Sequence, residues 1–212
     1  RRSRVTVRAR REFNATSAAA AASRTPEERV LRALASPFGA TDFPVRMTTF
    51  AYQDENAAKV RIVIATEVGP SDGASGNLML AYELLDANGR SVTSQPRRET
   101  LTPLTTDNGP VFQHVAALVV DPGTYTLKLA AVDERGRQAS VERSVKAWQM
   151  ADMPLAVSDL TVADPLFGPN AKAAQTVQAR LTSPRLLAYF ELYSNQADYL
   201  TDAGVRVDVA SE

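Results

Sequence analysis

The chain has 212 residues, 44% of them hydrophobic, which suits one large globular domain or two modest ones. Lysine and arginine total 24, and so do aspartate and glutamate, so the formal net charge of zero provides no overall field that would attract nucleic acid. Cysteine is absent, which excludes disulfides, thiolate zinc sites and cysteine nucleophiles. No apolar run reaches the roughly 18 residues that would predict a transmembrane helix.

The N-terminal region opens on a strand pattern rich in arginine. Between Arg4 and Arg10, small apolar residues alternate with arginine and threonine, which predicts a half-buried strand with a cationic outer face rather than a nucleic-acid-binding arm. A chain that starts inside a strand without a methionine indicates a fragment. The alanine-rich stretch that follows contains the N-glycosylation pattern Asn14-Ala-Thr16 and predicts a linker or a helix extension. We interpret residues 1–24 as the terminal strand of a preceding domain plus this linker.

A capping box marks the next element. Thr25 supplies an N-cap hydroxyl, a proline follows at the first helical position, and Glu28 stands at N3. This pattern predicts a helix over 26–35, which ends before Pro37 and buries a stripe of three residues: Val30, Leu31 and Leu34. Residues 25–42 are therefore expected to form a short helix and a connector, and the two adjacent glutamates serve the helix start.

From residue 43 to residue 148 the hydrophobic period changes to two. One strand is predicted directly after the turn Asp121-Pro-Gly123, because the residues from Tyr125 to Ala131 alternate between two faces. Six further strand patterns lie before and after it, at 43–50, 60–65, 78–84, 91–94, 111–120 and 138–148. Residues 95–108 read as a polar section. About seven strands in about a hundred residues predict an immunoglobulin-like or fibronectin III-like β-sandwich. Tyr125 stands where the tyrosine corner of such folds would lie, although a core-filling tyrosine explains it equally well.

The remaining residues, 149–212, offer four shorter strand patterns after a connector at 149–154. These lie at 155–162, 176–181, 186–193 and 205–209. Sixty-odd residues are too few for a seven-stranded module, so we expect a second, incomplete β-sandwich or strands that share a sheet with neighbouring segments. The whole chain is thus predicted to be mainly β, with one short N-terminal helix.

No residue emerges as a catalytic, cofactor-binding or metal-binding candidate. His114 is the chain's only histidine and lies within a strand, so we interpret it as a hydrogen-bonded or surface histidine. The glycine-rich loop 69–76 lacks the context of a phosphate cradle. Several carboxylates fall in predicted turns, where turn chemistry explains them more simply than calcium: Asp54, Glu55, Asp72, Asp121, Asp133 and Glu134.

Four aromatic residues near the C-terminus suggest sugar stacking: Tyr189, Phe190, Tyr193 and Tyr199. Because Phe190 would oppose Tyr189 and Tyr193 on the same strand, the four are not expected to form a single exposed platform.

The order of segments resembles bacterial secreted proteins in which sandwich modules follow a von Willebrand factor A-related domain. The resemblance is carried by Arg4-Val-Thr-Val-Arg-Ala-Arg-Arg-Glu-Phe13 for the last strand of the A-type domain and its exit, and by 27–43 for the junction. Four later motifs also carry it: Asp121-Pro-Gly-Thr-Tyr-Thr-Leu127, Asp133-Glu-Arg-Gly-Arg137, Pro154-Leu-Ala-Val-Ser-Asp-Leu160 and Tyr189-Phe-Glu-Leu-Tyr193. The Asp-x-Ser-x-Ser run of the A-type metal site is absent, so none of the family's metal or ligand residues maps onto this chain.

The resemblance implies a non-catalytic extracellular, periplasmic or cell-surface module that acts as a spacer or as a protein-interaction and adhesion scaffold. Its partner would be a protein or a cell-surface ligand bound through the parent protein, with no nucleic acid, no cofactor and no direct membrane insertion. The alternative is an accessory module of a secreted hydrolase that binds carbohydrate. A free-standing enzyme ranks third.

Overall fold

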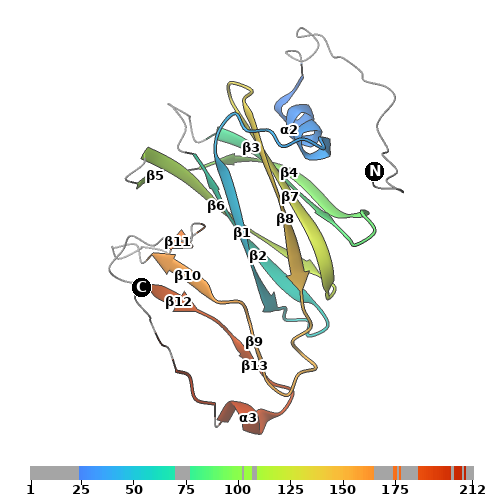
Figure 1. The fold of residues 1–212 in the computed structure, drawn as a ribbon, viewed down its shortest axis with the longest axis vertical. Coiled ribbons are helices and arrows are strands. Elements are labelled where there is room, and N and C mark those ends of the chain that lie inside the picture. The colour runs from blue at the N-terminus through green and yellow to red at the C-terminus, as the bar shows by residue number, and fades with distance from the viewer. Residues whose placement is uncertain are drawn as a thin grey trace, which may run out of the picture.

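Two four-stranded antiparallel sheets pack face to face in the computed structural model, which describes residues 24–69, 77–101, 103–106, 109–164, 174–175, 177, 186–201, 203–206 and 208 (Figure 1). The first sheet has the order β1 (Val45–Gln53), β2 (Val60–Val68), β6 (Gly109–Val120), β5 (Pro103–Thr106). The second has the order β4 (Ser91–Thr100), β3 (Asn77–Leu85), β7 (Gly123–Asp133), β8 (Gln138–Ala147). The strands β1, β5, β4 and β8 are therefore the four edges.

This strand order confirms the predicted immunoglobulin-like β-sandwich. In immunoglobulin domains the first, second, fifth and fourth strands form one sheet, and the third, sixth and seventh form the other. The same order arises here when β4 is taken as the extra strand beside β3. The turn expected at Asn88-Gly89 joins β3 to β4, with Gly89 at a φ of 75°, which glycine adopts without strain.

The core lies between the two sheets and follows the predicted alternation. On β3 and β7 the inward residues are buried: Leu78, Leu80, Tyr82, Leu84, Tyr125, Leu127, Leu129 and Ala131. They meet Val60, Ile62 and Ile64 from β2 and Met47 from β1. Burial of this many large apolar side chains is the main stabilising contribution to the sandwich.

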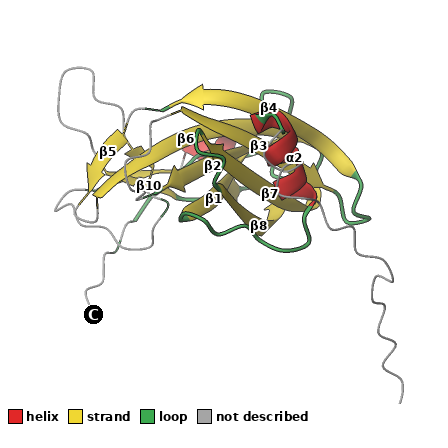
Figure 2. Ribbon diagram, turned by 90° about the horizontal axis from the view of Figure 1, so that it is seen from above, coloured by secondary structure: helices red, strands yellow, loops and turns green. Residues whose placement is uncertain are grey.

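Helix α2 (Pro26–Ala35) covers the outer face of the second sheet (Figure 2). The capping box is present as predicted: the Thr25 hydroxyl accepts from the Glu28 amide (3.2 Å) and the Glu28 carboxylate accepts from the Thr25 amide (3.0 Å). Val30, Ala33 and Leu34 pack against β3 and β7. Leu31 was predicted to be buried and is not, because its position on the helix turns it toward solvent; Ala33 takes its place.

The C-terminal region lies along the outer face of the first sheet. It forms two small sheets, one from β11 (Ala174–Gln175), β10 (Thr161–Asp164) and β12 (Leu187–Tyr189), the other from β13 (Leu192–Tyr193) and β9 (Ala156–Val157), followed by the helix α3 (Ala197–Thr201). Phe50, Tyr52 and Ala65, on the outward side of β1 and β2, are buried with Val177 packed against them. The expected second sandwich is thus a thin layer that packs on the first.

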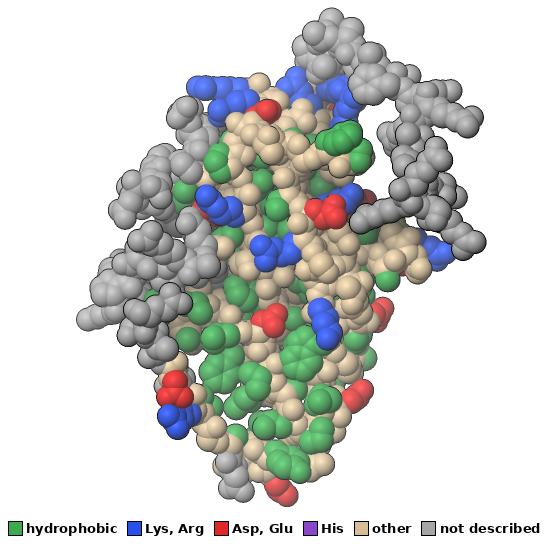
Figure 3. Space-filling model, viewed as in Figure 1, with side chains coloured by type: hydrophobic (Ala, Val, Ile, Leu, Met, Phe, Trp, Pro, Cys, Tyr) green, Lys and Arg blue, Asp and Glu red, His purple; other side chains and the backbone are tan. Residues whose placement is uncertain are grey.

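This layer keeps much of its apolar surface in contact with solvent. Figure 3 shows hydrophobic side chains gathered in the lower half of the view, over the C-terminal strands. Among the described residues, ten large hydrophobic side chains beyond residue 152 are exposed: Met153, Leu155, Val157, Leu160, Leu186, Leu187, Tyr189, Tyr199, Leu200 and Val205. The layer therefore depends on the sandwich beneath it for most of its packing.

Three further differences separate the prediction from the structure. The polar section 95–108 contains the second half of β4 and all of β5. On β6 the predicted alternation places Val111, Val115, Ala117 and Val119 on one apolar side. Val115 and Val119 of this set face solvent, whereas Phe112 and Val120, on the other side, enter the core. No strand is seen at 205, 206 and 208, the described part of the expected strand 205–209.

Some predictions fall outside the described residues. These are the arginine-rich strand at 4–10, most of the alanine-rich linker, the pattern at Asn14, the loop residues 70–76 with Asp72, and most of 176–181. Among the residues that are described, no helix is long and apolar enough to cross a membrane.

Candidate functional site

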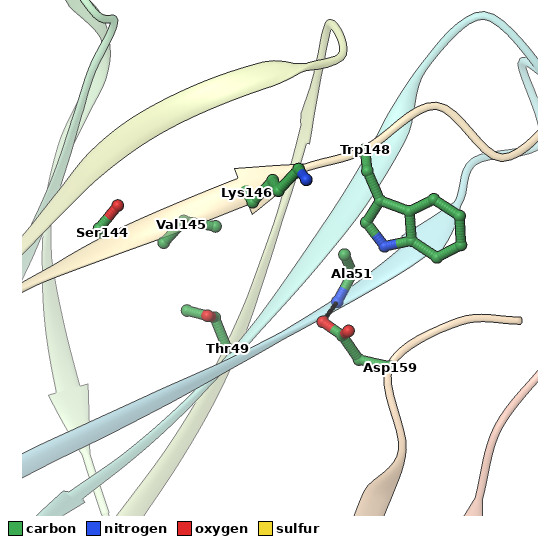
Figure 4. Close-up of a pocket in the computed structure, with 7 residues that line it drawn as sticks. All are labelled: Thr49, Ala51, Ser144, Val145, Lys146, Trp148 and Asp159. Carbon is green, nitrogen blue, oxygen red and sulfur yellow. Dashed lines mark hydrogen bonds between the residues drawn. The ribbon is translucent and has the colours of Figure 1, made fainter.

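A pocket of about 380 Å³ opens where the edge strands β1 and β8 lie side by side (Figure 4). Its walls come from both edge strands and from the chain that follows β8: Thr49, Ala51, Ser144, Val145, Lys146, Trp148 and Asp159. We call this the edge pocket. It combines one aromatic ring, one cation and one carboxylate with two hydroxyls, a composition that suits a mixed polar and apolar ligand.

The β1 side of the edge pocket is partly closed by the C-terminal region. The Ala51 amide donates to the Asp159 carboxylate (2.7 Å), and the Asp159 amide donates back to the Ala51 carbonyl (3.1 Å). One step further along, the Gln53 amide donates to the Tyr193 hydroxyl (3.0 Å). In an edge strand, every second residue points its backbone N–H and C=O groups away from the neighbouring strand. On β1 these are residues 45, 47, 49, 51 and 53, and we call their backbone groups outward, whichever way the side chains point. The C-terminal region thus binds the outward backbone groups of Ala51 and Gln53, and those of Thr49 stay open to the edge pocket.

On the β8 side, the start of the strand is already paired. The Asp42 amide donates to the Gln138 carbonyl (2.9 Å) and the Ser140 amide donates to the Ala40 carbonyl (2.8 Å), around an antiparallel bridge between Thr41 and Ala139. Residues 40–42 therefore act as a very short added strand. The next outward residues of β8 are 142, 144 and 146, and two of them line the edge pocket.

Two cations of β8 stand at this edge. Arg143 and Lys146 are exposed, and neither has an ion-pair partner within the described ranges. Their neighbour Glu142 is held by Lys128 (3.8 Å). Asp159 already accepts the Ala51 amide. The exposed edge of β8 is therefore net positive.

A second site lies between the first sheet and the C-terminal layer, around Glu191. The Glu191 carboxylate accepts hydrogen bonds from the hydroxyls of Tyr189 (2.6 Å) and Tyr193, and Arg61 donates to it at 3.3 Å. Burial first, and then the bond to Glu191, raises the pKa of Tyr193, whereas for Tyr189 the bond to Glu191 is the larger cause of a raised pKa. Both tyrosine hydroxyls thus stay protonated and donate their hydrogen bonds to the Glu191 carboxylate. We call these four residues the Glu191 cluster.

A pocket of about 260 Å³ adjoins the Glu191 cluster. Tyr52 and Tyr189 form one wall, with ring centroids 5.9 Å apart, and the Arg61 guanidinium lies 5.6 Å from the Tyr52 ring centroid. Val63, Ala163 and Leu187 supply an apolar floor, and the Tyr52 hydroxyl hydrogen-bonds Thr161. The strand break between β12 and β13 separates Tyr189 from Tyr193, so the four aromatics considered in the sequence do not share one strand face.

His114 lies at the inner face of β6, within a hydrogen-bonded chain. Its Nδ1 is 2.9 Å from the Tyr82 hydroxyl, which is 3.1 Å from the Thr66 hydroxyl, and its Nε2 is 3.6 Å from Glu99. Burial lowers the pKa of His114, with Glu99 acting in the opposite direction, and burial raises the pKa of Tyr82 to about 12. The imidazole is a partly buried, hydrogen-bonded group, in agreement with the sequence interpretation.

Most of the turn carboxylates that the structure describes hold a turn or bind a neighbouring side chain. Asp54 accepts the Asn56 amide, and Asp86 accepts the amides of Asn88 and Arg90. Asp133 accepts both the amide and the Nε of Arg137 (2.8 and 2.7 Å). Asp121 pairs with Lys59 at 2.6 Å. Within the part of the chain that the structure describes, no group of three or more His, Cys, Asp or Glu residues could hold a metal ion.

No family model and no curated protein matches the chain. A structural genomics target solved by X-ray crystallography is similar at 13% identity with a TM-score of 0.37, over 52% of this chain and 88% of its own. The putative ApaA protein from Bordetella pertussis is similar at 13% identity with a TM-score of 0.35, over 53% of this chain and 98% of its own. At these TM-scores, neither likeness carries an argument about function.

Proposed function

We propose that this chain is a non-catalytic module of a secreted or surface-bound von Willebrand factor A-related protein, where it serves as a spacer and protein-interaction scaffold. The observation that carries the proposal is that each outer face of the sandwich is partly covered by the same chain, by α2 over β3 and β7 on one side and by the C-terminal layer over β1 and β2 on the other. A sandwich covered in this way leaves its edge strands for contact with a partner.

The groups that could act in catalysis support the same proposal. His114 is hydrogen-bonded to Tyr82, and the turn carboxylates Asp54, Asp121 and Asp133 each hold a turn or an ion pair. General acid–base catalysis needs a titratable group within reach of a substrate. Here the only imidazole of the chain is 12% exposed and already hydrogen-bonded.

The test begins with the gene. The reading frame should encode, upstream of Arg1, an A-type domain with an Asp-x-Ser-x-Ser run, and the protein should be accessible to antibody on intact cells or in the culture medium. Deletion of residues 25–208 from the full-length protein should reduce adhesion. The A-type domain that remains in this deletion variant should still bind metal. A reading frame without an A-type domain, or a protein confined to the cytoplasm, would contradict the proposal.

The Glu191 cluster favours carbohydrate binding as a second candidate function, that of an accessory module of a secreted hydrolase. Tyr189 is 50% exposed and stands beside a pocket whose rim carries Arg61 and Glu191, which is the combination of aromatic face and polar rim that sugars bind. Tyr199 is 49% exposed and lies away from this pocket, so it provides a matched control. Retention on insoluble polysaccharides should fall in Tyr189→Ala and persist in Tyr199→Ala; no retention of the unsubstituted chain would exclude this function.

A further inference from the structure

We propose that the exposed edge of β8, at Glu142–Lys146, accepts an extended segment of a partner protein as an added β-strand, and that the edge pocket takes one of its side chains. The partner segment carries at least one acidic residue. This inference rests on the proposed function of an interaction scaffold and specifies where the partner binds and what its chemistry is. Addition of a strand to an open sheet edge is a common way in which β-proteins bind peptides.

The backbone groups needed for strand addition are available. Because Gln138 and Ser140 direct their backbone groups away from β7, the amides and carbonyls of residues 142, 144 and 146 point outward as well. No backbone hydrogen bond within the described residues uses the outward groups of these three positions. An unpaired row of this kind is a template for another strand.

The chain itself already shows the pairing. Residues 40–42 add to β8 through two backbone hydrogen bonds of 2.8 and 2.9 Å around the bridge from Thr41 to Ala139. This added strand stops two residues before Glu142, so the site that we propose continues an existing one along the same edge.

The edge pocket gives the added strand a place for a side chain. Trp148 lies at one end of the pocket, and Thr49 and Ala51 form the wall on the β1 side (Figure 4). A strand bound to β8 would direct alternate side chains to the same side, so one of them would enter this volume of about 380 Å³. An apolar or aromatic side chain suits it, because the indole ring offers a flat apolar surface.

Charge decides between a partner and a second copy of this chain. Arg143 and Lys146 lack an ion-pair partner among the described residues, while Glu142 is bound to Lys128. Two copies joined edge to edge would bring two net positive edges together, whereas an acidic segment would neutralise them. The exposed Arg143, which stands between Val141 and Val145, also discourages unselective pairing of this edge.

The experiment uses the full chain and a phage-displayed library of linear dodecapeptides as the probe. Trp148 is the only tryptophan of the chain, so its fluorescence reports directly on the edge pocket, and tryptophan-free peptides from the selection can be titrated against it. We expect selected peptides to be enriched in aspartate and glutamate and to change the Trp148 emission. Failure to select any peptide above an empty-resin control would overturn the inference.

A single substitution separates edge pairing from other modes of binding. Ser144→Pro removes an outward amide but no bond to β7, because Ser144 sits at a non-hydrogen-bonded pair with Thr126. Peptide affinity should fall about tenfold or more in Ser144→Pro, in keeping with loss of one backbone hydrogen bond and strand distortion, and stay within about twofold in Ser144→Ala. Equal affinity of a folded Ser144→Pro variant would overturn the edge site while leaving the scaffold function intact.

Two further measurements guard against misfolding and self-association. Hydrogen exchange of the unsubstituted chain should show that the Ser144 and Lys146 amides gain protection when peptide binds; unchanged exchange would contradict the proposal even if Ser144→Pro fails to fold. Lys146→Glu should weaken binding of the acidic peptides, whereas Arg135→Glu, at the exposed turn between β7 and β8, should not. A dimer in sedimentation that Ser144→Pro abolishes would show a second copy as the occupant and overturn the choice of partner.

Discussion

The Tyr125 hydroxyl donates a hydrogen bond of 2.8 Å to the carbonyl oxygen of Asp121, four residues earlier in the chain. Tyr125 stands at the start of β7, where the chain passes from one sheet to the other, and its ring is buried in the core. This is the tyrosine corner of immunoglobulin-like sandwiches. The two interpretations left open by the sequence are therefore both correct, because the same side chain fills the core and ties the corner.

Removal of this hydroxyl should destabilise the fold without disturbing its packing. Tyr125→Phe keeps the ring and leaves the Asp121 carbonyl without its partner, so we expect a loss of about 1 kcal/mol in the free energy of unfolding. Urea denaturation at neutral pH measures this loss. Tyr199→Phe, at an exposed position in α3, should change it by less than about 0.5 kcal/mol. Equal effects of the two substitutions would show that the corner bond contributes nothing.

The two leucines of α2 should differ strongly in their contribution. Leu34 is 4% exposed and packs on β3 and β7, whereas Leu31 is 43% exposed. Leu34→Ala should cost about 2–4 kcal/mol because it leaves a cavity under the helix, and Leu31→Ala less than about 1 kcal/mol. Thermal and urea unfolding of the two variants would measure this. Similar losses would indicate that the helix does not dock through Leu34.

The hairpin around Asp121-Pro-Gly123 could be predicted because local turn chemistry and the alternation of β7 agree with its place in the core. The strand β5 and the second half of β4 could not be predicted, because these edge segments lack an apolar alternation. Arg97 and Arg98 of β4 gain strand structure from pairing with β3, and β5 gains it from pairing with β6. The edge pocket was equally inaccessible to sequence reasoning. Ala51 and Asp159 are 108 positions apart, and no local pattern connects them.

Stability should depend on pH through His114. Burial lowers the pKa of the folded imidazole below its ordinary value near 6.5, so the unfolded chain binds a proton more readily than the folded one. The resulting stability is therefore fully present above about pH 6.5 and is lost as the pH falls through the folded pKa. We expect His114→Gln to lose less unfolding free energy than the unsubstituted chain between pH 7.5 and pH 5.5. Parallel losses in both proteins would contradict a buried neutral histidine.

Exchange of single amides should reveal how the C-terminal region covers β1. The Ala51 and Gln53 amides donate to Asp159 and Tyr193, whereas no group among the described residues accepts a hydrogen bond from the outward amide of Thr49. We therefore expect the Ala51 and Gln53 amides to exchange slowly and the Thr49 amide to exchange quickly. Asp159→Ala should speed exchange at Ala51 and leave Gln53 protected. Tyr193→Phe should do the reverse, so each variant is the control for the other. Nuclear magnetic resonance of the exchanging chain resolves the three sites, and a uniform rise at all three would mean that the layer detaches as one unit.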